Sequence, residues 1–439
     1  MVRISALEGI TYNLDLVDIN SVVAPPYDVI SSQDREDLYA LSEYNIVKLI
    51  LGNILPDDND KENRYTRAEE YFKDWMSKGV LKKAENPCIY YYIQEYSLEN
   101  GETIKRKGFL AGTYLEQYSK EGIMPHEYTM GGPKEDRLKL MKACKTNFSP
   151  IFMLYSDSQK AVDSLFDLSG EPFIDIVDNQ GIRNIVYVFD DRELIDKLTE
   201  LMSDKALLIA DGHHRYETAL AYKDYMISNS PNQNGDEPYN RVLCYYTNMD
   251  DENLKVYPTH RIVTKPVDRA KLLDSLDKLF DKKEYAFDSA DKNAVRTGFI
   301  SDLEKTALDN IAFGLYMKDS DRFYLYTLRE KERINKVLAE KDVPEVLRKL
   351  DLSLLHKIVI TDILEISEED QLKQNGIKYI KKGNEAIEAV DNNTAELVFI
   401  MATPGLGLIR EVAKAGYRMP QKSTYFYPKL LSGLVINPL

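Results

Sequence analysis

The segment Asp211–Arg215 (Asp-Gly-His-His-Arg) concentrates side chains that can bind an anion. An apolar strand is predicted over 205–210 and a helix after Gly212, so the segment forms a turn between them. Asp211 can cap that helix, and a helix start presents free N–H groups and a partial positive charge. Arg215 adds a planar set of donors that suits phosphate. The segment therefore predicts a phosphate-binding turn.

Two other interpretations of this turn remain. Asp211 can be a helix cap only, with His213 and His214 as polar surface residues of the first helical turn. A zinc site is disfavoured, because adjacent residues on a helix diverge by about 100° and the i, i+4 spacing of helical metal ligands is absent.

Three further segments carry candidate site residues. Glu127 follows His126 in a predicted loop, and a carboxylate beside a phosphate site can act as general base for an alcohol. The C-terminal tail 419–429 is predicted to be extended and rich in donors, and Tyr257–Arg261 is a polar strand end. Their candidate phosphate or substrate ligands are His126, His260, Arg261, Lys422, Ser423, Thr424 and Lys429, which add to Gly212 and Arg215 of the turn. A solvated C-terminal strand is the alternative for the tail.

Alternation and apolar periodicity predict the elements that must position these residues. Strands are expected over 88–96, 105–114, 185–189, 205–210, 241–247, 255–257 and 396–402, and helices over 33–43, 135–145, 191–203, 352–365 and 407–416, besides the helix after Gly212. The fold class is mixed α/β. We expect a catalytic core in 1–264, a peripheral α+β insertion in 265–350, and a C-terminal segment, 351–439, that returns to complete the site.

Composition excludes several classes of protein. The chain has 439 residues with 57 basic and 72 acidic side chains, a net charge of −15, which disfavours nucleic acid as a partner. No apolar run approaches the roughly 20 residues of a membrane span, and the N-terminus does not resemble a signal peptide, so we expect a cytoplasmic protein without a membrane partner. Three separated cysteines fit neither a disulfide framework nor a four-thiolate zinc site. The oligomeric state is not predicted.

The motifs resemble those of the bacterial domain-of-unknown-function family DUF1015 over nearly the whole chain. The matching segments are Ala24–Ile30, Lys134–Arg137, Asn147–Ile151, Asp211–Ala219, Pro258–Arg261 and Met419–Lys429. A more distant resemblance, in three segments, is to the archaeal free serine kinase, which implies a ParB/sulfiredoxin-like core. Those segments are Pro125–Glu127, Leu208–Arg215 and Pro420–Pro428.

The kinase resemblance implies roles for the candidate residues. Glu127 would be the base for the serine hydroxyl, and Asp211, His213, His214 and Arg215 would be at the transferred phosphoryl group and its Mg²⁺, with Asp211 as metal ligand. The implied activity is phosphotransfer to free L-serine from ADP, ATP or pyrophosphate, or the reverse hydrolysis of O-phosphoserine. The alternatives are a ParB-like nucleotide-binding regulatory module without catalysis and a metal-dependent hydrolase.

Overall fold

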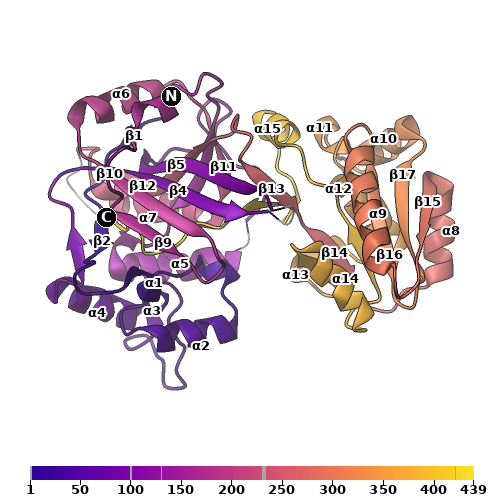
Figure 1. Ribbon diagram of the computed structural model, residues 1–439, viewed down its shortest axis with the longest axis horizontal. Helices are drawn as coiled ribbons and strands as arrows, with labels where there is room; N and C mark the ends of the chain where they lie inside the picture. Colours follow the sequence, from indigo (N-terminus) through magenta and orange to yellow (C-terminus); the bar gives the residue numbers. More distant parts are fainter. Residues whose placement is uncertain (1, 99–100, 130, 230–233, 421) are drawn as a thin grey trace. The chain divides into compact units, whose positions relative to one another are not determined.

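The described chain divides into two compact units (Figure 1). The computed structural model describes residues 2–98, 101–129, 131–229, 234–420 and 422–439. Unit 1 consists of Met1–Pro125, Thr129–Lys255 and Pro428–Leu439, and unit 2 of His126–Tyr128 and Val256–Tyr427. Each unit is therefore assembled from separate stretches of sequence.

Unit 1 is built on a nine-stranded mixed sheet of described strands, in which β1 pairs with β5 beside the path β6-β11-β8-β12-β5-β4-β10-β9. The strands are β1 (Ile4–Ser5), β4 (Ile89–Ser97), β5 (Thr103–Tyr114), β6 (Ile123–Met124), β8 (Ile151–Tyr155), β9 (Ile174–Val177), β10 (Arg183–Phe189), β11 (Leu207–Asp211) and β12 (Arg241–Asn248). Two small ladders join β2 (Ile10–Tyr12) to β3 (Leu81–Lys83) and β7 (Thr146–Asn147) to β21 (Asn437–Pro438).

Helices of unit 1 cover this sheet and help to bury a large apolar cluster. Tyr216 and Ala219 of α7 and Leu198 of α6 pack there against strand residues such as Phe109 and Met153. The helices are α1 (Ile19–Val22), α2 (Ser32–Leu41), α3 (Val47–Ile50), α4 (Arg64–Ser77), α5 (Gly131–Cys144), α6 (Arg192–Met202) and α7 (His213–Asn229), with short turns η1 (Tyr27–Val29), η2 (Asp163–Leu165) and η3 (Pro238–Asn240). Because β11 runs directly into α7, the start of that helix lies at the end of a buried strand.

Unit 2 contains a six-stranded antiparallel sheet in its described residues, ordered β15-β17-β16-β19-β14-β18. Its strands are β14 (His260–Val263), β15 (Phe280–Ala286), β16 (Ala312–Met317), β17 (Arg322–Leu328), β18 (Ile377–Ile380) and β19 (Leu397–Ile400), and a separate ladder pairs β13 (Lys255–Pro258) with β20 (Thr424–Tyr427). The predicted insertion, 265–350, supplies only β15–β17 of this sheet. It is therefore part of a larger unit, because strands from both sides of it in sequence complete the same sheet.

Helices of unit 2 pack on the sheet through Phe299 and Leu303 of α9 and Ala386 and Ile387 of α14. The helices are α8 (Arg269–Leu279), α9 (Lys292–Ala307), α10 (Lys331–Glu340), α11 (Glu345–Arg348), α12 (Asp351–Leu354), the π-helix η4 (Leu355–Ile363), α13 (Glu368–Lys373), α14 (Gly383–Asp391) and α15 (Leu406–Lys414). The predicted helix over 352–365 is thus mostly π-helix, a form that is rare and often found at functional sites.

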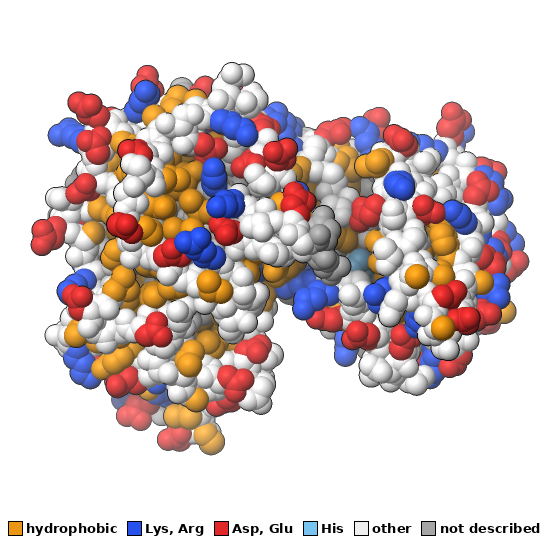
Figure 2. Space-filling view, viewed as in Figure 1, with side chains coloured by type: hydrophobic (Ala, Val, Ile, Leu, Met, Phe, Trp, Pro, Cys, Tyr) orange, Lys and Arg blue, Asp and Glu red, His pale blue; other side chains and the backbone are white. Residues whose placement is uncertain are grey.

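The mixed α/β class predicted from the sequence is confirmed. Within the described residues, none of the helices combines the length and the apolar character needed to cross a bilayer. On the face drawn in Figure 2, acidic and basic side chains are interspersed over the surface of each unit.

Candidate functional site

The turn between β11 and α7 has a backbone that only glycine accommodates easily. Gly212 has φ +94°, and its carbonyl accepts the first helical hydrogen bond from the Tyr216 N–H at 3.0 Å. A Cβ added at Gly212 would lie 3.0 Å from the Arg215 guanidinium, which folds back over the turn. Gly212, rather than Asp211, therefore occupies the capping position, and Asp211 is the last residue of β11.

Asp211 is held between two cations. Its Oδ1 accepts from Lys429 Nζ at 2.6 Å, and its Oδ2 accepts from Arg215 Nη2 at 2.6 Å. Burial alone would raise the pKa of Asp211, but the charges of Lys429 and Arg215 outweigh it and hold that pKa well below its usual range. Two cations and one carboxylate leave the group with a net charge of +1 beside the start of a helix, which favours an anion.

The structure places His213 and His214 in the first turn of α7, where His213 is buried and His214 is half-buried. Thr218 Oγ1 donates to the His214 carbonyl at 2.7 Å, so this turn is tied to the next one. The residues Asp211, Arg215 and Lys429, which the sequence predicted as site residues, lie together in unit 1. They lie at the start of α7, whose first two residues are the two histidines.

Sequence reasoning missed a buried arginine that supports this cluster. Arg106 is 1% exposed, donates from Nη2 to Gln94, and lies 4.6 Å from the centre of the Phe152 ring. Gln94 Nε2 in turn donates to the Lys429 carbonyl at 3.0 Å. Arg106 and Gln94 thus fix the segment that carries Lys429. No spacing rule connects these positions, because Gln94 and Lys429 are 335 residues apart.

A resident Mg²⁺ does not fit the residues around Asp211. Magnesium is held in proteins by oxygen ligands, mainly carboxylates, with several waters. Both oxygens of Asp211 accept hydrogen bonds from cations. Within the described part of the chain, no three histidine, cysteine or acidic residues are grouped so that they could hold a metal ion. The predicted assignment of Asp211 as a metal ligand is therefore not supported, and we derive no step through a metal.

Glu127 lies in unit 2 against the C-terminal segment that the sequence predicted as a substrate strand. Its Oε1 accepts from the Ser423 N–H at 3.0 Å, the Thr424 N–H at 3.1 Å and Thr424 Oγ1 at 3.2 Å. His126 is fully buried, and its Nε2 lies 2.9 Å from Thr424 Oγ1. Glu127 also forms a parallel bridge with Met419. A carboxylate, an imidazole and a hydroxyl group are thus brought together, an arrangement that can accept and hold a proton.

The buried side chain of Arg261 helps to position the same C-terminal segment. It is fully buried, donates from Nη2 to the Lys422 carbonyl at 3.2 Å and from Nε to His356 Nε2 at 3.1 Å, and also donates to the Thr259 carbonyl. Burial lowers the pKa of Arg261 to about 10, so it remains charged at neutral pH. Lys422 has φ +56° and an exposed side chain. The structure therefore shows a contact to the main-chain carbonyl of Lys422, whereas the sequence predicted its side chain as a ligand.

The remaining predicted donors have structural contacts. Ser423 Oγ donates to the Pro420 carbonyl at 2.5 Å, and His260 Nδ1 accepts from the Met401 N–H at 3.1 Å. Lys422 and Lys429, which the sequence groups into one donor cluster, belong to different units. Ser423 and His260 therefore each make a main-chain contact within unit 2.

Unit 2 is expected to lose stability in mild acid because of two buried histidines. Burial, reinforced by the charge of Arg261, lowers the pKa of His260 to about 4 and that of His356 to about 3. The unfolded chain binds protons below a pH of about 6.5 while the folded chain does not, so stability falls as the pH drops from there, by about 1.4 kcal/mol per unit for each histidine.

Urea unfolding at pH 7.0 and pH 5.5 tests this expectation. His356→Gln keeps an acceptor for Arg261 but cannot titrate, so the difference in unfolding free energy between the wild type and the variant should shift by about 1.4 kcal/mol between the two pH values. An unchanged difference would show that His356 is not kept neutral by the fold.

Comparison with known proteins identifies the chain's family. The model of the family "Protein of unknown function (DUF1015)" matches residues 4–353, as the motifs predicted. None of the curated proteins matches the chain.

Among solved structures, the chain is similar to a free serine kinase in complex with AMP, at 14% identity and a TM-score of 0.34, covering 73% of this chain and 86% of that one. It is also similar to a conserved hypothetical protein from Pyrococcus furiosus, at 16% identity and a TM-score of 0.32, covering 71% and 92% of the two chains. A third is SbnI with C-terminal truncation from Staphylococcus aureus, at 9% identity and a TM-score of 0.33, covering 73% and 85%. Likenesses at this level are distant, so function must be argued from the residues.

Proposed function

The chain belongs to the DUF1015 family, and we propose that it is a phosphotransferase acting on a small hydroxyl compound, with free L-serine and O-phosphoserine as the pair to test first. The observation that carries the proposal is the Lys429–Asp211–Arg215 group at the start of α7, with both ion pairs at 2.6 Å. An acidic protein that keeps a net positive group half-buried at a helix start has a place for phosphoryl oxygens.

In the proposed reaction the substrate hydroxyl oxygen attacks the terminal phosphorus of the donor. A new O–P bond forms, the bond from that phosphorus to the leaving phosphate oxygen breaks, and the hydroxyl proton passes to Glu127. The phosphoryl charge is stabilised by Arg215, Lys429 and the first N–H groups of α7, all in unit 1, whereas the proposed proton acceptor Glu127 belongs to unit 2. ADP, ATP and pyrophosphate are each possible donors, which would leave as AMP, ADP and phosphate. In the hydrolytic direction O-phosphoserine is the donor: a water oxygen attacks its phosphorus, the bond from that phosphorus to the serine oxygen breaks, and serine and inorganic phosphate are released.

The contacts of Glu127 support its proposed role. Its carboxylate is fixed by two backbone N–H groups and one hydroxyl, so its direction is set before a substrate arrives. Phosphoryl transfer depends mainly on positioning and electrostatic stabilisation, and such a carboxylate needs only to hold one proton.

Phosphorus NMR tests the proposal directly. The purified chain is incubated with Mg²⁺ and L-serine plus ADP, ATP or pyrophosphate in separate tubes, and with O-phosphoserine alone. The appearance of phosphoserine in one tube supports the kinase direction and identifies the donor, and phosphate release from phosphoserine alone supports the phosphatase direction. Unchanged spectra in every tube would contradict the proposal. In that case nucleotide binding measured by calorimetry would favour the regulatory module.

A further inference from the structure

A cavity in unit 1 is lined by segments that the sequence singles out, most of which the proposed reaction does not use. It encloses about 50 Å³ of water-accessible space, and its polar lining includes Tyr27, Arg137, Asn147, Ser149, Arg215 and Thr218. Four of the motifs, Ala24–Ile30, Lys134–Arg137, Asn147–Ile151 and Asp211–Ala219, thus each contribute to it. A cavity of roughly 10–15 Å³ is enough for one water, so this one has room for a small polyatomic ion.

The Arg137 side of the cavity carries excess positive charge. Asp136 Oδ1 pairs with Arg64, and Asp136 Oδ2 accepts from Arg137 Nε at 2.7 Å. Burial alone would raise the pKa of Asp136, but the charges of Arg137 and Arg64 and a hydrogen bond from Tyr65 lower it, so the carboxylate is ionised. Two arginines and one carboxylate give this group a net charge of +1.

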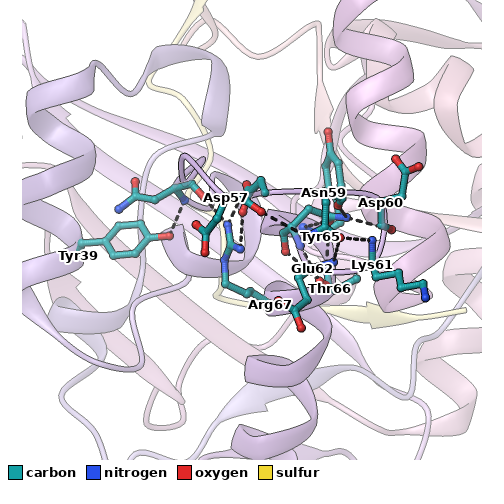
Figure 3. A network of polar contacts seen from close by, with 12 residues as sticks. Tyr39, Asp57, Asn59, Asp60, Lys61, Glu62, Tyr65, Thr66 and Arg67 are labelled. Atoms are coloured by element: carbon teal, nitrogen blue, oxygen red, sulfur yellow. Dashed lines mark hydrogen bonds and ion pairs between the residues drawn. The ribbon is translucent and has the colours of Figure 1, made fainter.

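The polar network that precedes α4 fixes the partner arginine of this group. Figure 3 shows Arg67 and the residues around Asn59 at the start of that helix. Arg67 Nη1 donates to Asp58 at 2.6 Å. The Asn63 side chain caps the helix, and the Asn63 N–H donates in return to Thr66 Oγ1 at 3.0 Å. Tyr65, labelled in the same view, donates to Asp136 at 2.7 Å. Arg64 is therefore held at Asp136 by a rigid helix start.

Arg215 of the second net-cationic group lines the same cavity. The side chains of Arg137 and Arg215 are only 9% and 13% exposed. The Tyr27 ring lies 4.1 Å from the Arg137 guanidinium, and burial raises the pKa of Tyr27 even though Arg137 and Arg215 both act to lower it. Its hydroxyl therefore stays protonated at neutral pH and can donate a hydrogen bond. Arg137 and Arg215, one residue from each group of net charge +1, thus line one small space together with Tyr27.

We propose that this cavity is an oxyanion site that takes a phosphate group, with Arg137, Arg215 and Tyr27 as its ligands. A carboxylate carries less charge than a phosphate, and a cavity flanked by two net positive groups favours the more highly charged anion. If the bound phosphate is the terminal group of the donor, the inference rests on the proposed function. Binding of inorganic phosphate is tested independently of that function.

Arg137 and Arg64, which both pair with Asp136, provide a matched pair of variants. Arg137→Gln removes a cation that lines the cavity, and Arg64→Gln removes a cation that pairs with the same carboxylate but does not line it. Both lower the local charge by one. Calorimetric titration with inorganic phosphate at pH 7.5 should show at least about tenfold weaker binding for Arg137→Gln and less than about threefold weakening for Arg64→Gln. Tyr27→Phe should weaken binding by about threefold or more.

Equal phosphate affinity in the wild type and Arg137→Gln would overturn the inference, as would equal weakening by Arg64→Gln and Arg137→Gln. Circular dichroism and thermal unfolding identify any variant that fails to fold. If Arg137→Gln does not fold, the inference is tested with Tyr27→Phe, which removes only one oxygen atom. Parallel titrations with pyrophosphate and ADP distinguish the sources of the phosphate. If the wild type binds phosphate and Arg137→Gln does not, while no transfer is seen by NMR, the site stands and the proposed function fails.

Discussion

Glu127→Gln is expected to lower the rate of phosphoryl transfer by about 10²- to 10⁴-fold while leaving ligand affinity within about threefold of the wild type. Glutamine retains an oxygen that accepts the Ser423 and Thr424 N–H groups at the positions of the present 3.0 and 3.1 Å bonds. The loop should therefore keep its shape and lose only a group that can take a proton. The initial rate of phosphoserine formation or hydrolysis, followed by phosphorus NMR, measures the effect.

Thr424→Val serves as the control for this experiment. It removes the hydroxyl that donates to Glu127 at 3.2 Å and lies 2.9 Å from His126 Nε2, but it keeps the carboxylate and both backbone donors. A small effect of Thr424→Val beside a large effect of Glu127→Gln would assign the loss to the proton acceptor and not to a disturbed loop. If Glu127→Gln binds nucleotide and turns over like the wild type, Glu127 only supports the C-terminal segment, and the proposed base must be abandoned.

Local patterns predicted most of the elements that carry the candidate residues. The apolar run over 205–210 became β11, and the Asp-Gly pair marked the start of α7, because a buried strand and a tight turn leave strong local signals. The helix predicted over 352–365 is mostly the π-helix η4. Sequence periodicity does not distinguish i→i+5 from i→i+4 hydrogen bonding, so this difference had no signal in the sequence.

Contacts between distant segments were beyond local patterns. Asp211 and Lys429 are 218 residues apart, and Glu127 and Thr424 are 297 apart. The residue types in each segment indicated binding, but which segments meet depends on how the chain packs within each unit. The predicted role of Asp211 illustrates this: a helix cap and a metal ligand were both chemically reasonable, but Gly212 occupies the capping position, and both Asp211 oxygens accept hydrogen bonds from Lys429 and Arg215. Arg137 was part of a recognised motif, yet only the folded chain brings it to a cavity with Arg215.

Asp211→Asn is expected to destabilise unit 1 by about 3 kcal/mol at pH 7. The asparagine amide can accept from only one of Lys429 and Arg215, whose side chains are each 13% exposed, and it directs N–H donors at the other. The folded-state pKa of Asp211 lies below its unfolded value, so the carboxylate contributes its full stabilisation above a pH of about 4 and loses it as the pH falls further. The difference in unfolding free energy should therefore stay constant between pH 5 and pH 8.

The control for Asp211→Asn is an exposed pair of the same chemical type in the same unit. Asp175 accepts from Arg183 at 2.7 and 2.6 Å, but the two side chains are 35% and 45% exposed, so Asp175→Asn should cost less than about 1 kcal/mol. Urea unfolding of both variants measures the contrast. Equal losses would mean that the Asp211 pair is solvated in solution, and the argument for a desolvated anion site at the start of α7 would fail with it. A large loss for Asp211→Asn alone would establish that Lys429 and Arg215 are cations held together by a buried carboxylate, which is the condition for two like charges to converge on one phosphate.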